Sequence, residues 1–165
     1  MSVKKLSLSG VLVAAGVVCS AFYLPVGAAK VFPVQHFINV LAAVVLGPAY
    51  AVGMAFTTSL LRNLMGTGSL LAFPGSMCGA LLSGLLYRYT RQLGGAFLGE
   101  VIGTGLLGAL LAYPVARLFL SGKGAFYGFV LPFGLSSLAG AVISVVFLIA
   151  LKRAGILQKM LHGEV

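Results

Sequence analysis

Acidic residues are almost missing from this sequence: only two of its 165 residues are acidic, and both are glutamates. Charged residues of either sign make up 8% of the chain, whereas a soluble globular domain carries about 25%. Because so few charges cannot coat a water-facing surface, lipid or neighbouring helices must surround most side chains. The composition, 60% hydrophobic, therefore excludes an ordinary soluble domain.

Motifs of catalysis and metal binding are missing as well. The sequence has no G-x-x-x-x-G-K-[ST] loop, no H-E-x-x-H and no G-x-S-x-G elbow. Cys19 and Cys78 lie singly in apolar stretches, so we expect buried core residues rather than a disulfide or a metal site. Paired carboxylate chemistry would require Glu164 to fold back toward Glu100. We therefore expect no enzyme, no metal and no cofactor, and any ATP hydrolysis would belong to a separate subunit.

The apolar stretches that are present predict an all-α, multi-pass protein of the cell membrane. A spanning helix needs about 20 apolar residues, so the length allows about six spans and leaves no room for an extramembrane domain. The first stretch, behind Lys4 and Lys5, also resembles a signal peptide, but the count of six favours a retained helix. We expect one membrane domain, residues 1–165, with helices over residues 6–23, 34–46, 49–65, 76–89, 96–120 and 126–151.

The net charge of +9 predicts an orientation rather than a nucleic-acid partner, because the basic residues flank apolar stretches and form no basic face. Six spans put both termini on one side of the bilayer. Cytoplasmic loops concentrate Lys and Arg, so the larger group is expected inside, which gives an N-in/C-in topology. The inner group is Lys4, Lys5, Arg88, Arg91, Lys152, Arg153 and Lys159, and the outer group is Lys30, Arg62, Arg117 and Lys123.

Small residues recur at every fourth position in several stretches, as in Gly75 and Gly79 or in Gly95, Gly99 and Gly103. Ser136, Gly140 and Ser144 repeat the pattern. In lipid, such stripes let helices approach closely, so we expect intramolecular packing at each of them. Gly10 and Ala14 have the same spacing on a helix expected at the edge of the bundle. For this pair, docking of a partner protein is a second interpretation besides intramolecular packing.

Uncharged polar residues gather at the helix ends expected on the outer side. His36 and Asn39 are three residues apart and share a helix face. Arg62 would serve an anionic group of a ligand or extend to the lipid headgroups. Together these residues predict a shallow outer pocket for a small polar ligand, such as a heteroaromatic ring with a hydroxyl tail. The candidate ligand contacts are Gln35, His36, Asn39, Arg62, Asn63, Thr67 and Ser69, with Tyr113 and Glu100 as weaker candidates.

Glu100 is the one acidic residue inside an apolar stretch. Counted from Gly94, it lies about 9 Å into its helix at 1.5 Å per residue. A carboxyl group at such a position is unfavourable and indicates a function. The depth places it nearer the cytoplasmic side than the expected pocket. Pairing with Arg88 or Arg91, a role in an inward-facing state, a protonated structural role and ligand contact all remain open.

Two blocks of sequence resemble a known family. They are the segment Phe32-Pro33-Val34-Gln35-His36-Phe37-Ile38-Asn39-Val40, followed by Leu46-Gly47-Pro48, and the segment from Arg62-Asn63-Leu64-Met65-Gly66-Thr67-Gly68-Ser69 to Phe73-Pro74-Gly75-Ser76. Over nearly its whole length, the chain resembles the S components, the substrate-binding membrane subunits, of energy-coupling-factor (ECF) vitamin transporters. Within these it is most similar to the ThiW type, which is associated with the thiazole precursor of thiamin.

The resemblance implies a function and a set of partners. An S component captures its vitamin near the outer face, under the loop after the first helix. It then docks on a transmembrane coupling subunit that carries two cytoplasmic ATPases, and reorients in the bilayer to release the ligand inside. For this type the implied ligand is hydroxyethylthiazole. The docking motif of the family, A-x-x-x-A, falls on Gly10 and Ala14, with Val11 and Ala15 or Ala15 and Cys19 as alternative registers.

Two other functions remain open at this stage. The chain would be an S component for another vitamin, such as a pyrimidine precursor, or a stand-alone secondary transporter driven by protons through Glu100. No inverted repeat, which many secondary transporters contain, is recognisable in the sequence.

Overall fold

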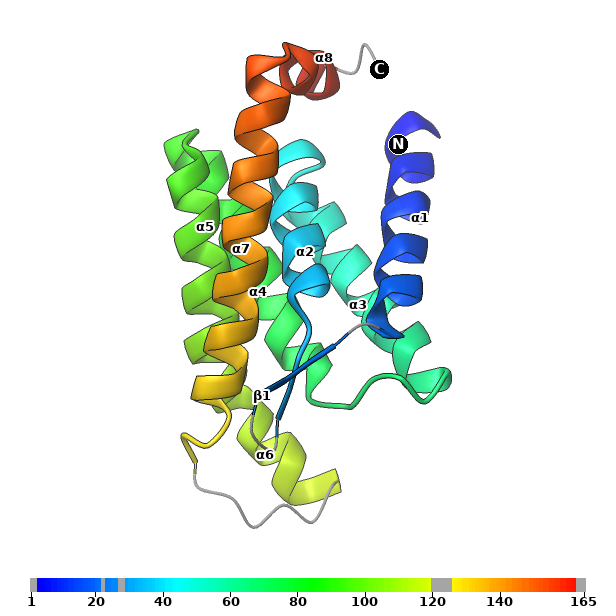
Figure 1. Ribbon diagram of the computed structural model, residues 1–165, viewed down its shortest axis with the longest axis vertical. Helices are drawn as coiled ribbons and strands as arrows, with labels where there is room; N and C mark the ends of the chain where they lie inside the picture. The colour runs from blue at the N-terminus through cyan, green and yellow to red at the C-terminus, as the bar shows by residue number, and fades with distance from the viewer. Residues whose placement is uncertain (1–2, 22, 27–28, 120–125, 163–165) are drawn as a thin grey trace.

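The computed structural model describes residues 3–21, 23–26, 29–119 and 126–162 as a bundle of helices (Figure 1). The predicted turn at 121–124, Lys123 and Glu164 lie outside the described residues. Each of the six predicted helices has a helical counterpart within a few residues of its expected ends. The principal elements are α1 (Val3–Val18), α2 (Pro33–Val45), α3 (Pro48–Leu64), α4 (Ala72–Thr90), α5 (Leu93–Ile102), α6 (Ala109–Phe119) and α7 (Val130–Arg153).

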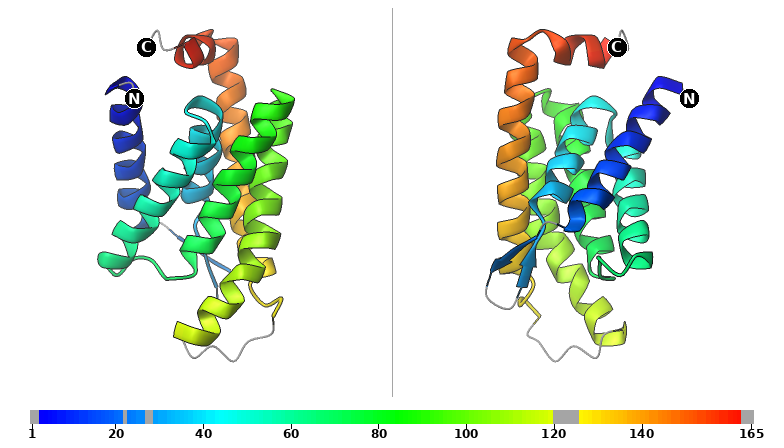
Figure 2. Two further views of the ribbon diagram at one scale, coloured as in Figure 1. Left: turned by 180° about the vertical axis from the view of Figure 1, so that it is seen from behind. Right: turned by 45° about the vertical axis from the view of Figure 1, so that its right-hand side comes forward.

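The fifth predicted helix is continuous but not uniform. A π-helical segment, η2 (Gly103–Gly108), joins α5 to α6, and Pro114 lies inside α6. A widened turn of this kind breaks the regular ladder of hydrogen bonds and re-aims the side chains that follow. Figure 2 shows α6 running obliquely away from the line of α5 at the end of the bundle.

Three shorter elements complete the chain, and none of them was predicted. A 3₁₀ turn, η1 (Cys19–Ala21), ends the first helix, and helix α8 (Ile156–His162) follows α7. The segment expected as a short polar loop after the first helix contains an antiparallel hairpin of β1 (Leu24–Val26) and β2 (Ala29–Val31). Val26 and Val31 favour extended backbone, because β-branched residues are enriched in strands.

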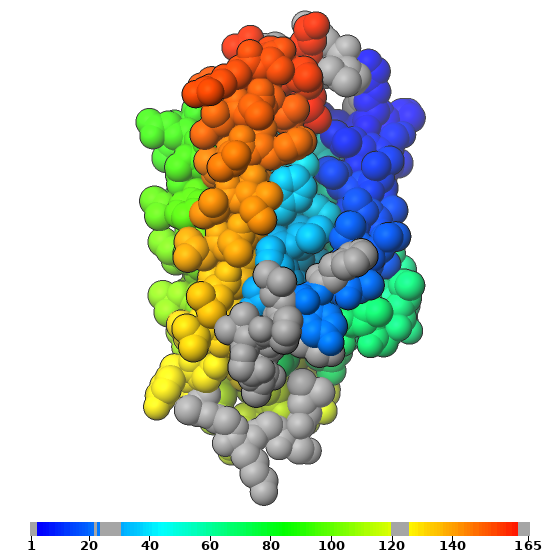
Figure 3. Space-filling model, viewed as in Figure 1, coloured from blue at the N-terminus to red at the C-terminus, as the bar shows by residue number. Residues whose placement is uncertain are grey.

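Helix α2 is the centre of the bundle. Nearly all of its residues are buried, and it packs against α7, α4 and α3. In the space-filling view it lies between α7 and α1 (Figure 3). Gly47, with φ of 93°, and Pro48 at the first position of α3 end it abruptly, as the Leu-Gly-Pro pattern predicts. Helix α2 has 13 residues and is therefore only about 20 Å long.

Glycine stripes hold the helices close together, which confirms the predicted intramolecular packing. A Cβ atom on Gly99 would lie 2.5 Å from the backbone of α4, and one on Gly103 would lie 2.6 Å from Cys78 O. On α7, a Cβ atom on Gly140 would lie 2.7 Å from His36 Cβ. These contacts show that α4 packs closely on α5, and α2 on α7.

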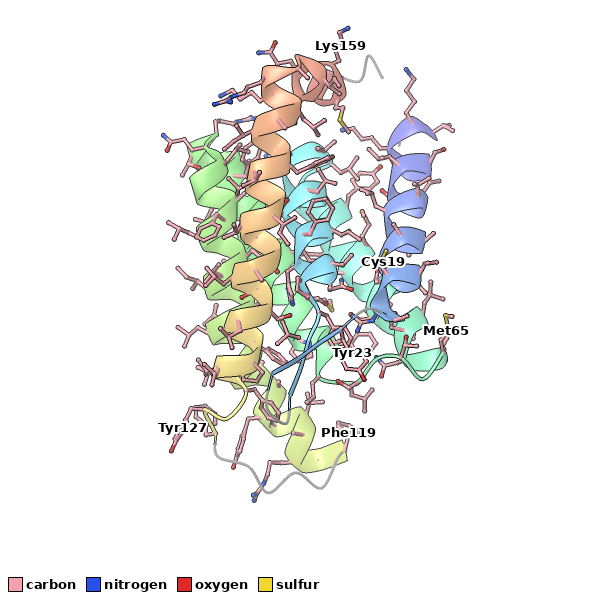
Figure 4. The ribbon with its side chains drawn as sticks, viewed as in Figure 1. Cys19, Tyr23, Met65, Phe119, Tyr127 and Lys159 are labelled. Carbon is pink, nitrogen blue, oxygen red and sulfur yellow. The ribbon has the colours of Figure 1, made fainter. Side chains whose placement is uncertain are left out.

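The two chain ends lie at the same end of the molecule, together with α8 (Figures 1 and 2). Helices α4 and α7 end there, and α1 and α5 begin there. Most basic residues of the predicted inner group are found at these four helix ends, and Figure 4 shows Lys159 at this end and Tyr23 in the opposite half of the bundle. Which end faces the cytoplasm remains a prediction.

By length and composition, three helices of the described residues can cross a membrane: Val3–Ala21, Leu93–Phe119 and Val130–Arg153. Their mean hydropathies are 1.5, 1.6 and 2.3, and Pro33–Val45 is a shorter apolar helix. Helix dominates the described residues. These features confirm a mainly helical fold and are consistent with a membrane protein, while the number of six spans remains a prediction.

Candidate functional site

A cavity of about 980 Å³ lies within the half of the bundle that is distant from the chain ends. Helices α2, α3, α4 and α7 contribute to its wall, as do the turn η1 after the first helix, the η2 segment and the turn after α3. Four aromatic rings line it, from Tyr23, Phe32, Phe129 and Phe133. The polar lining residues are Ser20, Gln35, His36, Arg62, Thr67, Ser69, Ser76, Thr104 and Ser136.

The first turn of α2 supplies one wall of the cavity, and its neighbours fix its position. Pro33 is the first residue of the helix, which suits a position without a hydrogen-bonded N–H. The N–H of Phe32 donates to Ser136 Oγ on α7 at 2.8 Å. Gly140, one turn further along α7, leaves room for this turn of α2. Helix α7 therefore holds Gln35 and His36 in place from outside the cavity.

Beneath His36, three side chains converge on one oxygen atom of Glu100. His36 Nδ1 lies 2.8 Å from Glu100 Oε1, and Asn39 Nδ2 donates to the same oxygen at 3.2 Å. The hydroxyl of Thr104 lies within 2.9 Å of it. The Glu100 side chain is fully buried, and its Oε2 has no partner among the described residues. With an ionised Glu100, whose oxygens only accept, His36 Nδ1 is the donor of this contact.

A chain of hydrogen bonds connects Glu100 to the far wall. Arg62 Nη1 donates to Gln35 Oε1 at 3.4 Å, and Gln35 Nε2 donates to Asn39 Oδ1 at 3.4 Å. Asn39 then donates to Glu100 and also to the carbonyl of Ser76 at 3.1 Å. Gln35 and Asn39 are four residues apart and face the same way on α2. In this chain of hydrogen bonds, each donor lies on the Arg62 side and each acceptor on the Glu100 side, so the amide dipoles reinforce one another.

The turn after α3 folds back over the last turn of that helix. The N–H groups of Thr67 and Gly68 both donate to the carbonyl of Arg62, each at 2.9 Å. Gly66 has a φ of 72°, which a residue with a Cβ rarely adopts. A Cβ atom on Gly68 would lie 3.0 Å from Arg62 Cβ. Thr67 Oγ1 lies 3.1 Å from Ser20 Oγ, so the turn is also tied to the end of the first helix.

Five of the predicted contact residues line the cavity together: Gln35, His36, Arg62, Thr67 and Ser69. Asn39 and Glu100 lie directly behind them, in contact with His36 or Gln35. The predicted pocket residues are therefore brought together from α2, α3 and the following turn. The cavity is deeper than the shallow cup that the sequence suggested, because α2 begins well inside the bundle.

Asn63 and Tyr113, like Asn39 and Glu100, are not among the lining residues of the cavity. Asn63 uses its amide to bind the carbonyls of Ser59 at 2.8 Å and Ser69 at 3.0 Å, which shapes the turn after α3. Tyr113, on α6, packs edge-on against Phe126 with ring centroids 5.1 Å apart. A direct contact of either residue with a ligand remains a prediction.

The pairing of Glu100 with Arg88 or Arg91 was also wrong. Its ion-pair partner among the described residues is His36. The rise along the helix placed Glu100 nearer the cytoplasmic side than the pocket, which was assumed to lie at the outer surface. His36, in the first turn of a short and recessed α2, reaches the same depth.

Several lining residues were not predicted as contacts. Thr104 is four residues after Glu100, a spacing that puts both on one helix face and was readable from the sequence. Ser136 was assigned to helix packing, although it also lines the cavity. Phe32 belongs to the first of the two resemblance blocks but was not assigned a role. Phe129 and Phe133 also line the cavity, but no sequence pattern distinguishes them from the many other apolar residues of the chain.

Gly79 provides a direct test of the polar cluster. A Cβ atom there would lie 2.6 Å from Glu100 Oε1 and would collide with Thr104 Oγ1. We expect Gly79→Ala to displace both side chains and to destabilise the fold by about 1–3 kcal/mol, the usual range for overpacking. Gly53→Ala on α3, where a Cβ atom meets nothing within 4 Å, is the matched control. Thermal unfolding midpoints in detergent measure both, and equal midpoints would contradict the close packing at Gly79.

The bundle and its cavity define a class: a helical membrane protein with a cavity lined by aromatic and polar side chains. The chain belongs to the ThiW family of thiamine-precursor transporter proteins, whose family model matches residues 6–154. A comparison with curated proteins finds no significant match. The family and the structure together identify a transporter of the membrane.

Proposed function

We propose that this chain is the substrate-binding S component of an ECF-type importer, and that it captures hydroxyethylthiazole in the cavity between α2, α3 and α7. It delivers the ligand inward together with a transmembrane coupling subunit and cytoplasmic ATPases, in an N-in/C-in orientation with the cavity toward the outside. The family supplies the transported class, thiamine precursors. The S-component architecture and the thiazole rest on the sequence resemblance.

The observation that carries the proposal is the composition of the cavity wall. Its volume of about 980 Å³ is at the upper end of the range for small-molecule sites, which are mostly apolar with a few fixed polar groups. Tyr23 and Phe32, whose ring centroids are 6.0 Å apart, offer faces for a heteroaromatic ring. His36 and Gln35 offer hydrogen-bonding groups for a ring nitrogen and a hydroxyl. Such a wall suits a small polar aromatic compound.

The purified chain alone is expected to bind hydroxyethylthiazole with one-to-one stoichiometry and to hydrolyse no ATP. Isothermal titration calorimetry and a thermal shift measure the binding, because a ligand that binds only the folded state raises its stability. Tyr113→Phe, outside the cavity lining, serves as a variant with unchanged affinity. Stabilisation by a pyrimidine precursor and not by the thiazole would overturn the choice of substrate while leaving the S-component assignment in place.

A further inference from the structure

Arg62 is a buried cation on the wall of the cavity. Arg62 is only 3% exposed, although it lies in the last turn of α3 near the end of the bundle. Such low exposure excludes the interpretation that it extends to lipid headgroups. The guanidinium carbon lies 4.3 Å from the centroid of the Phe32 ring, so the aromatic face fixes the position of the cation.

The hydrogen-bonding capacity of Arg62 is largely unused. Its Nη1 donates to Gln35 Oε1 at 3.4 Å, a long contact with a neutral amide. Its Nε is buried and has no partner among the described residues. A guanidinium group carries five N–H donors in a rigid fork. Apart from the Nη1 contact with Gln35, this fork has no hydrogen-bond partner among the described residues.

No direct counter-charge reaches Arg62 from the described part of the chain. Glu100 is the one acidic residue there, and its ion pair is with His36. Arg62 is connected to Glu100 only through the side chains of Gln35 and Asn39. A buried charge without a direct partner is unfavourable, and a ligand that brings the opposite charge removes that penalty.

We propose that the cavity selects an oxyanion, a carboxylate or phosphate monoester, carried by the thiamin precursor, and that Arg62 binds it. The inference rests on the proposed function, and it refines the ligand from the neutral alcohol hydroxyethylthiazole to an anionic thiamin precursor. Planar guanidinium groups pair with two oxygens of a carboxylate or phosphate at once, which a single hydroxyl does not permit. The hydroxyl of Ser69 lies on the same cavity and adds a neutral donor, whereas the hydroxyls of Ser20 and Thr67 donate to backbone carbonyls.

The experiment compares three thiazoles that differ only at the tail: the alcohol, its monophosphate, and the acid with a carboxylate in place of the terminal CH₂OH. Affinities are measured by calorimetry on the purified full chain at fixed ionic strength. At least one anion is expected to bind about tenfold or more tightly than the alcohol, because charge-assisted hydrogen bonds are stronger than neutral ones. Arg62→Gln should reduce that preference to less than about twofold, with Arg62→Lys in between.

Arg117→Gln is the matched control, because Arg117 is an exposed arginine on α6 outside the cavity lining. It should leave all three affinities unchanged. The inference is overturned if the alcohol binds as tightly as both anions, or if Arg62→Gln weakens alcohol and anion equally. Measurements on the wild type alone already decide the first point, even if Arg62→Gln fails to fold.

The same measurements separate this inference from the proposed function. Binding of the alcohol without preference for either anion leaves hydroxyethylthiazole as the substrate and removes the oxyanion. If no thiazole binds, the alcohol and monophosphate of the pyrimidine precursor are compared in the same way. If the pyrimidine monophosphate binds more tightly than the pyrimidine alcohol, and Arg62→Gln removes that difference, the oxyanion inference holds and the thiazole is rejected as the substrate. Failure of every one of these anions to bind overturns the inference.

Discussion

Glu100→Ala is expected to weaken binding of hydroxyethylthiazole by about tenfold to hundredfold, although Glu100 does not line the cavity. Hydrogen bonds to charged groups contribute about 1.5–3 kcal/mol each, and 1.4 kcal/mol is about a factor of ten in affinity. Removal of the carboxylate leaves His36 Nδ1 and Asn39 Nδ2 without their shared acceptor. The imidazole then loses both its tautomer and its orientation. Glu100→Gln, which retains one acceptor oxygen, should have the smaller effect.

A double-mutant cycle shows whether Glu100 acts through His36. If Glu100 positions the imidazole, the affinity loss caused by Glu100→Ala should fall to less than about threefold in a His36→Ala background, since coupled residues are not additive. Thermal unfolding without ligand controls for general loss of stability. A full and additive loss in that background would instead indicate direct ligand contact by Glu100.

Glu100 also distinguishes the proposed importer from a proton-driven transporter. An S component needs its coupling and ATPase subunits, so proteoliposomes that contain this chain alone should accumulate no thiazole under a pH gradient. Accumulation that Glu100→Gln abolishes would contradict the importer and favour the secondary transporter. The ion pair with His36 does not decide between these two functions, because a proton carrier and a positioning residue both need a defined partner.

The helices of this fold were predictable because each depends on local sequence. Apolar length sets each helix, and the Gly47-Pro48 pair sets the break between α2 and α3 through its own backbone restrictions. The hairpin of β1 and β2 was missed because each strand has only three residues, too few to show an alternating pattern. The π-helical segment before α6 was missed for another reason. It depends on packing against α4 and α7, which no local pattern records.

The candidate site was predictable in its membership more than in its depth. Gln35, His36 and Arg62 were identifiable because polar residues are rare in this chain and therefore informative. Their depth depended on how far α2 is recessed, and Gly140 and Ser136 on another helix determine that. Asn63 shows the opposite case: a polar residue beside the site binds the backbone of its own turn instead.

Leucine at Gly10 and Ala14 should abolish uptake while leaving ligand binding intact. Both residues are exposed on α1, and a Cβ atom on Gly10 meets nothing within 4 Å, so the larger side chains fit the isolated chain. The opposite face of α1, with Ser9, Val13 and Gly16, is buried against the bundle. A coupling subunit that packs against small residues would be forced away by two leucines. Thiazole uptake is measured in cells that also express the coupling and ATPase subunits.

The size of the effect follows from the geometry of close helix contacts. Small residues let two helix backbones approach, and a leucine at the contact removes that approach altogether, so uptake should fall at least about tenfold. Gly53→Leu makes the same chemical change on the exposed face of α3 and should leave uptake unchanged. Ala15→Leu tests the neighbouring register, in which Val11 and Ala15 form the contact. Full uptake by the Gly10 and Ala14 variants, with loss in Ala15→Leu, would move the docking surface around the helix, and full uptake by all of them would remove it from α1.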